Sequence, residues 1–420
     1  MSSYLPRLLD PLLDSYLDQL PALMVVGPRS CGKATTAERH ARTTIRLDHH
    51  AEAAAVTPDV DAALRNRDEP ILLDEWQRLP SVMWAVKRAV DAERRPGRFL
   101  ITGSAGLETK SQLWPGTGRV VMLPMYPLTV AEQQQTGTQP FIDRVVAGEL
   151  LDRASGATLD VHAYLRLALR SGFPEPALQL DETTARAWLE SYADQVALRD
   201  AQGYDKVADA ARLRSYLEAY ALNSAGSPHH KTIYDAAGIA RDTALAYERR
   251  LSELLVVHQL PAWSSNRLKR LSRSPKRFVV DAGLLCGILR VGFDEVAASS
   301  DLAGRTLETF VVSQLLAEAA VAGSRYRLMH LRGPNGRHEI DVMAEFGGGR
   351  LVGIEIKAAA GAGAHDARHL AWLRDSMPDA FEAGVVLHTG EHTYRLSDRI
   401  VAAPISTLWA PSASKPQQVP

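Results

Sequence analysis

Short apolar runs separated by longer helix-like stretches fill the first 130 residues of the chain. The runs are too short for helices and end at polar or turn-forming residues, which is typical of buried strands. They lie at 23–26, 44–48, 71–74, 99–102 and 119–123. An amphipathic segment at 8–20 precedes them, and 81–94 is the clearest helical stretch between them. Strands that alternate with helices predict an α/β domain with a mostly parallel sheet.

Helical periodicity replaces this pattern from about residue 160. Helices are predicted at 162–170, 183–199, 207–222 and 300–322, and two or three short ones within 230–258. Strand signals return at 326–331, 339–344, 351–356 and 383–387. The order α/β, all-α, α/β predicts three domains and a tail of disordered composition, with boundaries at 1–150, 151–295, 296–410 and 411–420.

The composition is that of an ordinary globular protein, with 46% apolar and 23% charged residues. Lys and Arg number 48 against 49 Asp and Glu, so the net charge is −1. This balance argues against a surface devoted to nucleic acid or membrane, although a local basic patch remains compatible with it. No apolar run approaches the ~20 residues that span a bilayer. With only Cys31 and Cys286, far apart in sequence, we expect a soluble protein of the reducing cytoplasm.

A phosphate-binding pattern follows the first predicted strand. The Walker A form is G-x-x-x-x-G-K-[ST], in which backbone N–H groups surround the phosphates and the lysine reaches their oxygens. The segment here consists of Gly27, Pro28, Arg29, Ser30, Cys31, Gly32, Lys33 and Ala34, followed by Thr35. Its position between a strand and a helix-like stretch is the one the motif requires. We therefore predict an ATP site in this segment.

The last position of this loop departs from the pattern. Ala34 stands where Ser or Thr supplies a hydroxyl to Mg²⁺. Thr35 and Thr36 follow, but neighbouring residues on a helix point about 100° apart, so neither replaces that hydroxyl automatically. Nucleotide binding through the loop is expected to persist, whereas metal-dependent hydrolysis is expected to be weakened.

Four further residues, in three places along the chain, carry candidate catalytic groups. Asp74 and Glu75 end a predicted strand, where the first would hold Mg²⁺ through water and the second would orient the attacking water. Thr102 ends the next strand and is placed to sense the γ-phosphate or that water. Arg119 is a candidate finger toward the nucleotide of a neighbouring subunit, in a homo-oligomer. A solvated strand end, a simple turn and a surface arginine are the respective alternatives.

Together these segments resemble the bacterial and archaeal AAA-type ATPases whose loop begins G-P-R-x-x-G-K. The resemblance rests on the loop, on Leu73-Asp74-Glu75, on the strand Leu100–Ser104 and on Gly118-Arg119 before Pro124–Leu128. It continues into Arg170–Pro174 and Arg199-Asp200. It implies a P-loop fold, ATP hydrolysis with Mg²⁺, and a C-terminal restriction-endonuclease-like domain without a known function.

Residues 231–262 are similar to a winged helix-turn-helix, with an Ala-Gly-Ile turn between two predicted helices. A recognition helix near 241–252 would suit a major groove of DNA. The following segment 266–277 carries six basic residues that would contact phosphates of DNA or RNA, namely Arg267, Lys269, Arg270, Arg273, Lys276 and Arg277. A solvated hairpin in a helical domain used only for packing fits the same pattern and is the more frequent case.

The C-terminal strands carry a second set of charged residues. Asp341 lies on one predicted strand, and Glu355 and Lys357 lie two residues apart on the next, beyond a turn at 347–349. Restriction-endonuclease-like nucleases use such a D…E-x-K set, with carboxylates on Mg²⁺ and the lysine near the attacking hydroxide. Glu308 on the preceding helix would add a carboxylate. A cross-strand ion pair is the plainer alternative.

The sequence thus predicts an ATP-binding protein, an ATPase that couples its nucleotide state to a nucleic-acid or protein partner. Two other functions remain open. One is a scaffold that binds nucleotide and hydrolyses it poorly, because Ala34 lacks the hydroxyl. The other is a nucleotide-regulated nuclease that uses Asp341, Glu355 and Lys357.

Overall fold

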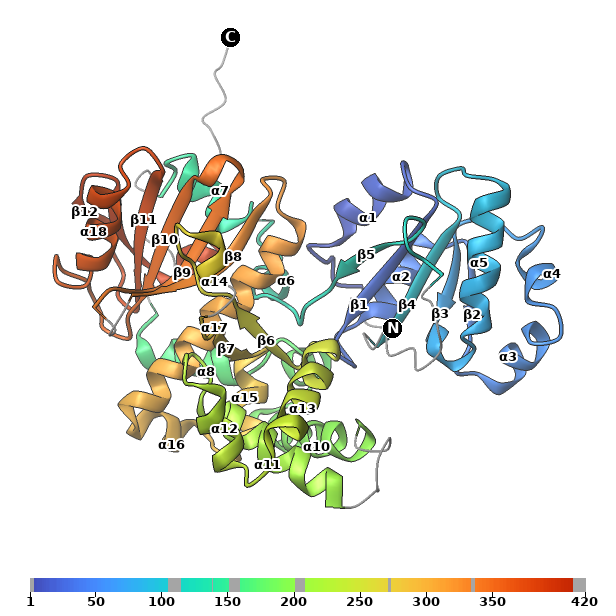
Figure 1. The fold of residues 1–420 in the computed structure, drawn as a ribbon, viewed down its shortest axis with the longest axis horizontal. Helices are drawn as coiled ribbons and strands as arrows, with labels where there is room; N and C mark the ends of the chain where they lie inside the picture. Colours follow the sequence, from blue (N-terminus) through green and yellow to red (C-terminus); the bar gives the residue numbers. More distant parts are fainter. Residues whose placement is uncertain are drawn as a thin grey trace, which may run out of the picture. The chain divides into compact units, whose positions relative to one another are not determined.

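The computed structural model describes residues 4–104, 115–137, 139–150, 159–200, 208–270, 273–333 and 337–410. The chain divides into two compact units (Figure 1). The first contains the residues up to Leu128 together with Arg250–Val256, and the second contains Thr129–Arg249 and the residues from Val257 onward. The predicted tail at 411–420 lies outside the described residues.

A five-stranded parallel sheet organises the first unit. Its strands are β1 (Ala22–Gly27), β2 (Thr43–Arg46), β3 (Ile71–Asp74), β4 (Phe99–Ser104) and β5 (Val121–Pro124). Their order is β2-β3-β4-β1-β5, and every pair is parallel. The five predicted strands are therefore confirmed. In this order β1 and β3 flank β4, so the carboxyl ends of the three strands share one edge, where ligands of open α/β sheets bind.

Helices pack on both faces of this sheet. They are α1 (Asp10–Leu17), α2 (Lys33–His40), α3 (His50–Val56), α4 (Val60–Leu64) and α5 (Ser81–Ala92). Helix α5 buries Val82, Met83 and Val86 against alternate strand residues such as Leu73 and Ile101. Helices α1 and α2 pack on β1, and the intervening strand residues are buried as well. Burial on both faces explains why these strands are continuously apolar in sequence.

Helices dominate the first half of the second unit. They are α6 (Val130–Gln134), α7 (Phe141–Val146), α8 (Val161–Leu169), α9 (Pro174–Leu178), α10 (Glu182–Asp200), α11 (Ala208–Leu222), α12 (His230–Ala236), α13 (Arg241–Glu253), α15 (Ala282–Leu289), α16 (Phe293–Ala298) and α17 (Ser300–Val321). Two antiparallel strands, β6 (Val257–Leu260) and β7 (Lys276–Val279), follow α13, with the short helix α14 (Arg267–Arg270) between them. The order helix, turn, helix, hairpin is compatible with the expected wing, and a winged helix stays a prediction.

A six-stranded mixed sheet forms the rest of the second unit. Its strands are β8 (Tyr326–Arg332), β9 (Glu339–Phe346), β10 (Leu351–Ile356), β11 (Phe381–His388), β12 (Tyr394–Ser397) and β13 (Ile400–Pro404). Their order is β12-β13-β11-β10-β9-β8, and the turn between β9 and β10 is Gly347–Gly349, as predicted. Helix α18 (Arg368–Ser376) packs on one face through Leu370 and Leu373, and α17 also contacts the sheet. The sequence analysis did not predict β12, β13 or α18.

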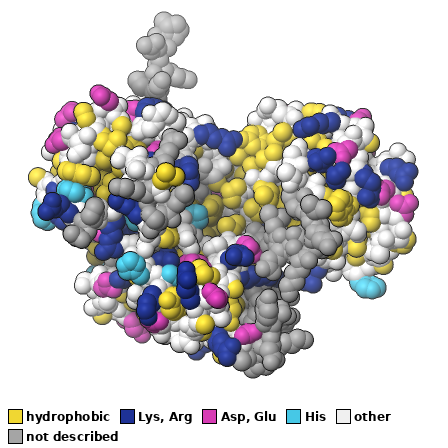
Figure 2. Space-filling model, in the orientation of Figure 1, with side chains coloured by type: hydrophobic (Ala, Val, Ile, Leu, Met, Phe, Trp, Pro, Cys, Tyr) yellow, Lys and Arg dark blue, Asp and Glu magenta, His cyan; other side chains and the backbone are white. Residues whose placement is uncertain are grey.

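The surface has no single dominant sign of charge on the side that Figure 2 shows, where basic side chains are spread over many elements with acidic ones among them. This agrees with the net charge of −1. Within the described ranges, no helix combines the length and the apolar character that crossing a membrane requires.

Candidate functional site

The loop between β1 and α2 has the backbone of an anion cradle. Gly32 adopts φ 96° and Ser30 adopts φ 57°, so two residues of the loop lie in the left-handed region. Gly27 packs so closely against the backbone of Met125 that an added Cβ would stand 2.3 Å from its carbonyl oxygen. The loop therefore requires glycine at both ends, and the N-terminus of α2 follows it directly.

The lysine of this loop is bonded to the loop itself, and no hydroxyl replaces the one that Ala34 lacks. Lys33 is buried and its Nζ donates to the carbonyl oxygen of Pro28, 2.7 Å away, which folds the ammonium back over the loop. Thr35 is exposed, whereas Thr36 is buried and accepts a hydrogen bond from the Tyr4 hydroxyl. Neither threonine stands at the position of Ala34, so the departure seen in the sequence persists in the fold.

Arg7, which the sequence analysis missed, is hydrogen-bonded to the backbone of the phosphate loop. The guanidinium is buried and donates to the carbonyl oxygens of Cys31, at 2.9 Å, and Tyr126, at 2.8 Å. It thus links the phosphate loop to the segment after β5. No motif signals this contact, because Arg7 lies 24 positions from Cys31 and 119 from Tyr126.

The acidic pair lies at the same edge of the sheet. Asp74 ends β3 and Thr102 lies on the adjacent β4, and both side chains are buried. The Thr102 hydroxyl donates to the Asp74 carboxylate, so it orients that carboxylate. Glu75 adopts φ 54°, and its carboxylate accepts a hydrogen bond from the amide of Gln77. A left-handed backbone at a non-glycine residue is strained, which is frequent at functional sites.

Arg119, the candidate finger, is paired within its own unit. Its Nε lies 2.5 Å from a carboxylate oxygen of Asp91 on α5, and both side chains are partly exposed. The hydrogen bond from Arg119, followed by the one from Lys87, lowers the pKa of Asp91 to about 2. A role of Arg119 toward a second subunit stays a prediction, and it would require this surface pair to open.

The C-terminal set converges in the structure. Glu308 lies on α17, Asp341 on β9, and Glu355 with Lys357 at the end of β10. Lys357 Nζ lies 2.9 Å from Glu355 Oε2, and the other carboxylate oxygen of Glu355 lies 3.8 Å from His369 Nδ1. Asp341 accepts a hydrogen bond of 3.0 Å from the backbone of Ile356, which ties β9 to β10.

An unexpected residue stands between these carboxylates. Lys276, at the start of β7, is buried; its Nζ forms an ion pair with Glu308 and donates to Asp341 over 2.9 Å. Burial raises the pKa of Glu308 to about 8 although the attraction of Lys276 opposes it. Burial and the nearby Asp341 raise the pKa of Glu355 to about 8, whereas Lys357 opposes the shift. In the described part of the chain, no three carboxylate, imidazole or thiol groups are arranged to hold a metal.

Three side chains of the basic segment 266–277 are used internally, which corrects the expectation that they face a nucleic acid. Lys276 is in the acidic cluster; Arg270 forms a bidentate pair with Glu345, at 2.6 and 2.7 Å. Arg277 is buried and pairs with Glu248 on α13 at 2.9 Å. Sequence alone shows how many charges a segment carries, whereas the partners come from β9, α13 and α17, which only the fold brings there.

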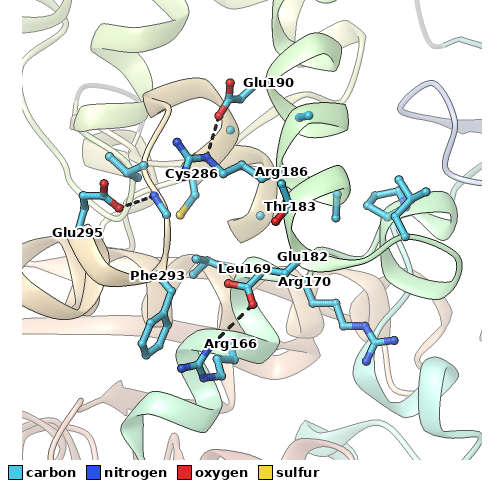
Figure 3. A pocket seen from close by; sticks show the side chains of 18 of the residues that line it. Arg166, Leu169, Arg170, Glu182, Thr183, Arg186, Glu190, Cys286, Phe293 and Glu295 are labelled. Carbon is cyan, nitrogen blue, oxygen red and sulfur yellow. Dashed lines mark hydrogen bonds and ion pairs between the residues drawn. The ribbon is translucent and has the colours of Figure 1, made fainter.

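A cavity of about 830 Å³ lies among α8, α9, α10, α15 and α16, and Arg170, from the segment 170–174 singled out in the sequence analysis, borders it (Figure 3). Charged side chains line it in pairs, among them Arg186 with Glu190 at 2.9 Å and Arg166 with Glu182 at 3.9 Å. The Cys286 thiol also borders it, and burial raises its pKa to about 12, so it stays protonated at neutral pH.

Three family models match consecutive parts of the chain. Residues 19–134 match an AAA domain, residues 161–295 a domain of unknown function (DUF8612), and residues 303–408 another domain of unknown function (DUF4143). The first match covers the parallel sheet, the phosphate loop and the acidic pair described above. It supports a nucleotide-binding or ATPase role for this part of the chain.

Two curated relatives are similar along most of the chain. They are the uncharacterized proteins Mb2031c of Mycobacterium bovis and Rv2008c of Mycobacterium tuberculosis, each 28% identical over 407 residues, or 93% of this chain and 82% of theirs. Among solved structures, the Walker-type ATPase PABY2304 of Pyrococcus abyssi aligns with a TM-score of 0.39 and 15% identity. That alignment covers 67% of this chain and 94% of the other.

Proposed function

We propose that this protein binds ATP with Mg²⁺ in the loop Gly27–Ala34 and hydrolyses it slowly. The observation that carries the proposal is the convergence of the glycine-bounded loop, the buried Lys33 and the Thr102–Asp74 pair at one edge of a parallel sheet. The AAA-domain match over 19–134 supports the same assignment.

The residues present fit such a ligand. The loop amides and the N-terminus of α2 would bind phosphate oxygens, and Lys33 would exchange its bond to Pro28 for one to phosphate. Asp74, oriented by Thr102, is the candidate group for holding the metal, and Glu75 would orient the attacking water. Bound Mg²⁺ would neutralise charge on the phosphates. Because Ala34 offers no oxygen to the metal, we expect this protein to bind ATP but to hydrolyse it slowly.

We propose further that nucleotide state is coupled to a partner, DNA, RNA or protein, through the second unit. The support is the surface of α13, which exposes Arg241, Leu245 and Arg249, whereas Arg270, Lys276 and Arg277 are already paired. A cytoplasmic location and a homo-oligomer remain part of this proposal. A nuclease is not part of it, because Lys276 already pairs with Glu308 and Asp341, two of the carboxylates that would hold its metal.

The decisive experiment measures ATP affinity and steady-state hydrolysis with Mg²⁺ for four variants beside the unaltered chain. Lys33→Ala should weaken ATP binding roughly 10- to 100-fold, because it removes a charged hydrogen bond. Ala34→Thr should raise the hydrolysis rate, and Glu75→Gln should abolish hydrolysis while ATP still binds. Lys231→Ala removes an exposed lysine of the other unit and should leave both quantities unchanged.

Two outcomes separate the alternatives. Binding with hydrolysis only after Ala34→Thr would identify the present chain as a nucleotide-binding scaffold. Equal ATP affinity in Lys33→Ala and Lys231→Ala would refute the nucleotide site altogether.

A further inference from the structure

The C-terminal cluster contains a cation that belongs to the protein itself. Lys276 Nζ lies within ion-pair distance of two carboxylates from different elements, Glu308 on α17 and Asp341 on β9. Its side chain is 3% exposed, and those of its two partners are 15% exposed. A cation at the position of this nitrogen is therefore within reach of both carboxylates and largely shielded from water.

Lys276 supplies positive charge next to these carboxyl groups. Glu308, Asp341 and Glu355 supply three carboxylates, and Lys276 with Lys357 supplies two ammonium groups. When all five are ionised, one negative charge remains, and removal of Lys276 leaves two. Unpaired charges in a buried site are strongly unfavourable. A divalent ion would neutralise the remaining pair, and carboxylate oxygens suit Mg²⁺ and Mn²⁺.

A second observation is that one buried carboxylate oxygen near this cluster accepts no hydrogen bond from the described residues. Glu355 is 3% exposed, yet its Oε1 accepts no hydrogen bond from the described residues. His369 Nδ1 is 3.8 Å from this oxygen and is instead engaged with the Glu339 carbonyl oxygen at 2.6 Å. A buried carboxylate oxygen without a donor is rare in native proteins and is available as a ligand.

Lys276 reaches the cluster from strand β7, which is separate from the elements that carry the carboxylates. The backbone of Arg277, next in the chain, exchanges hydrogen bonds with Ala225 and Gly226, and its side chain pairs with Glu248 on α13. Successive residues of a strand point to opposite faces. Strand β7 therefore places one cation in the acidic cluster and the next one against α13.

We propose that Lys276 occupies the position of a divalent metal ion between Glu308 and Asp341, so that these two carboxylates, with Glu355 nearby, form a cation site filled by the protein's own ammonium group. In this state the C-terminal domain binds no catalytic metal there. Replacing Lys276 by a neutral residue should uncover a site for Mn²⁺ or Mg²⁺. This proposal is independent of the nucleotide site.

The test measures Mn²⁺ binding to the nucleotide-free full chain by electron paramagnetic resonance, together with thermal denaturation. Lys276→Met should gain one Mn²⁺ site. Its affinity for Mn²⁺ should be at least tenfold higher than that of any Mn²⁺ site in the C-terminal domain of the unaltered chain. Its melting temperature should be lower than that of the unaltered chain and should rise with added Mn²⁺. Adding Asp341→Asn should remove the new site, whereas adding Asp74→Asn, in the phosphate-loop unit, should not. Lys231→Met is the matched surface control and should gain nothing.

Each outcome decides the proposal. Recovery of folded Lys276→Met only when Mn²⁺ is present supports it, as does a gained site that depends on Asp341. If Lys276→Met fails to fold in either condition, Lys276→Gln is measured in its place. Absence of an added Mn²⁺ site in every variant that folds overturns the proposal. So does failure of both variants to fold even with Mn²⁺, and so does equally tight Mn²⁺ binding at this cluster in the unaltered chain.

Discussion

Replacing Arg7 by methionine would test whether the phosphate loop depends on support from outside the motif. The guanidinium donates to the carbonyl oxygens of Cys31 and Tyr126, at 2.9 and 2.8 Å, and is 7% exposed. Methionine has a similar apolar stem but no donor, so the substitution removes both hydrogen bonds and leaves two buried acceptors without them.

The expected loss follows from these two bonds. A hydrogen bond to a charged group contributes about 1.5–3 kcal/mol, and leaving its buried partner unsatisfied adds to the cost. The two bonds share one side chain and are not additive, and the methionine stem recovers part of the packing. We therefore expect Arg7→Met to lower the free energy of unfolding of the first unit by about 3 kcal/mol. That is a large fraction of the ~5–15 kcal/mol that stabilises a typical domain.

The assay is hydrogen exchange by mass spectrometry on peptides that cover β1 and the loop, measured across a urea series. This readout reports the first unit alone, whereas tryptophan fluorescence would mix signals from both units. Arg42→Met is the matched control, because Arg42 is exposed and surface substitutions usually change stability by less than about 0.5 kcal/mol. If Arg7→Met also stays within about 0.5 kcal/mol of the unaltered chain, the supporting role of Arg7 is refuted.

Two further predictions concern buried positions of the two units. Gly27→Ala should lower the free energy of unfolding by about 1–3 kcal/mol and weaken ATP binding, because its Cβ would stand 2.3 Å from the Met125 carbonyl oxygen. Gly304→Ala lies in helix α17 with open space around the added Cβ, so thermal denaturation should show a gain of about 0.5–1 kcal/mol instead of a loss. Burial raises the pKa of Glu318 to about 8. The folded state therefore holds a proton on this carboxyl, and the stability that this proton provides is lost as the pH rises through about 8. The free energy of unfolding of the unaltered chain, measured by urea unfolding, should therefore fall by about 1 kcal/mol between pH 7 and 9 relative to that of Glu318→Gln. The glutamine side chain can still accept the hydrogen bond from the backbone N–H of Phe141. Equal urea-unfolding curves at both pH values would contradict this prediction.

Much of the fold could be predicted because its elements have local signals. All five strands of the first sheet were identified from short apolar runs, and the β9–β10 hairpin from three glycines between two strands. The short edge strand β12 (Tyr394–Ser397) and its neighbour β13 were missed. Strand β12 mixes polar and apolar residues in four positions. Strand β13 has only two β-branched residues, Ile400 and Val401, before two alanines and a proline, so neither short pattern favours a strand strongly.

The amino-acid sequence by itself determined the phosphate loop, the strands around it and the absence of a hydroxyl at Ala34, because each depends on residue type and spacing along a few positions. Only the tertiary structure decided the electrostatic partners. Arg7 reaches Cys31 and Tyr126, and Lys276 reaches Glu308 and Asp341, across separations that carry no local pattern. A buried charge must find a partner wherever packing places one, and that partner is set by the meeting of distant elements.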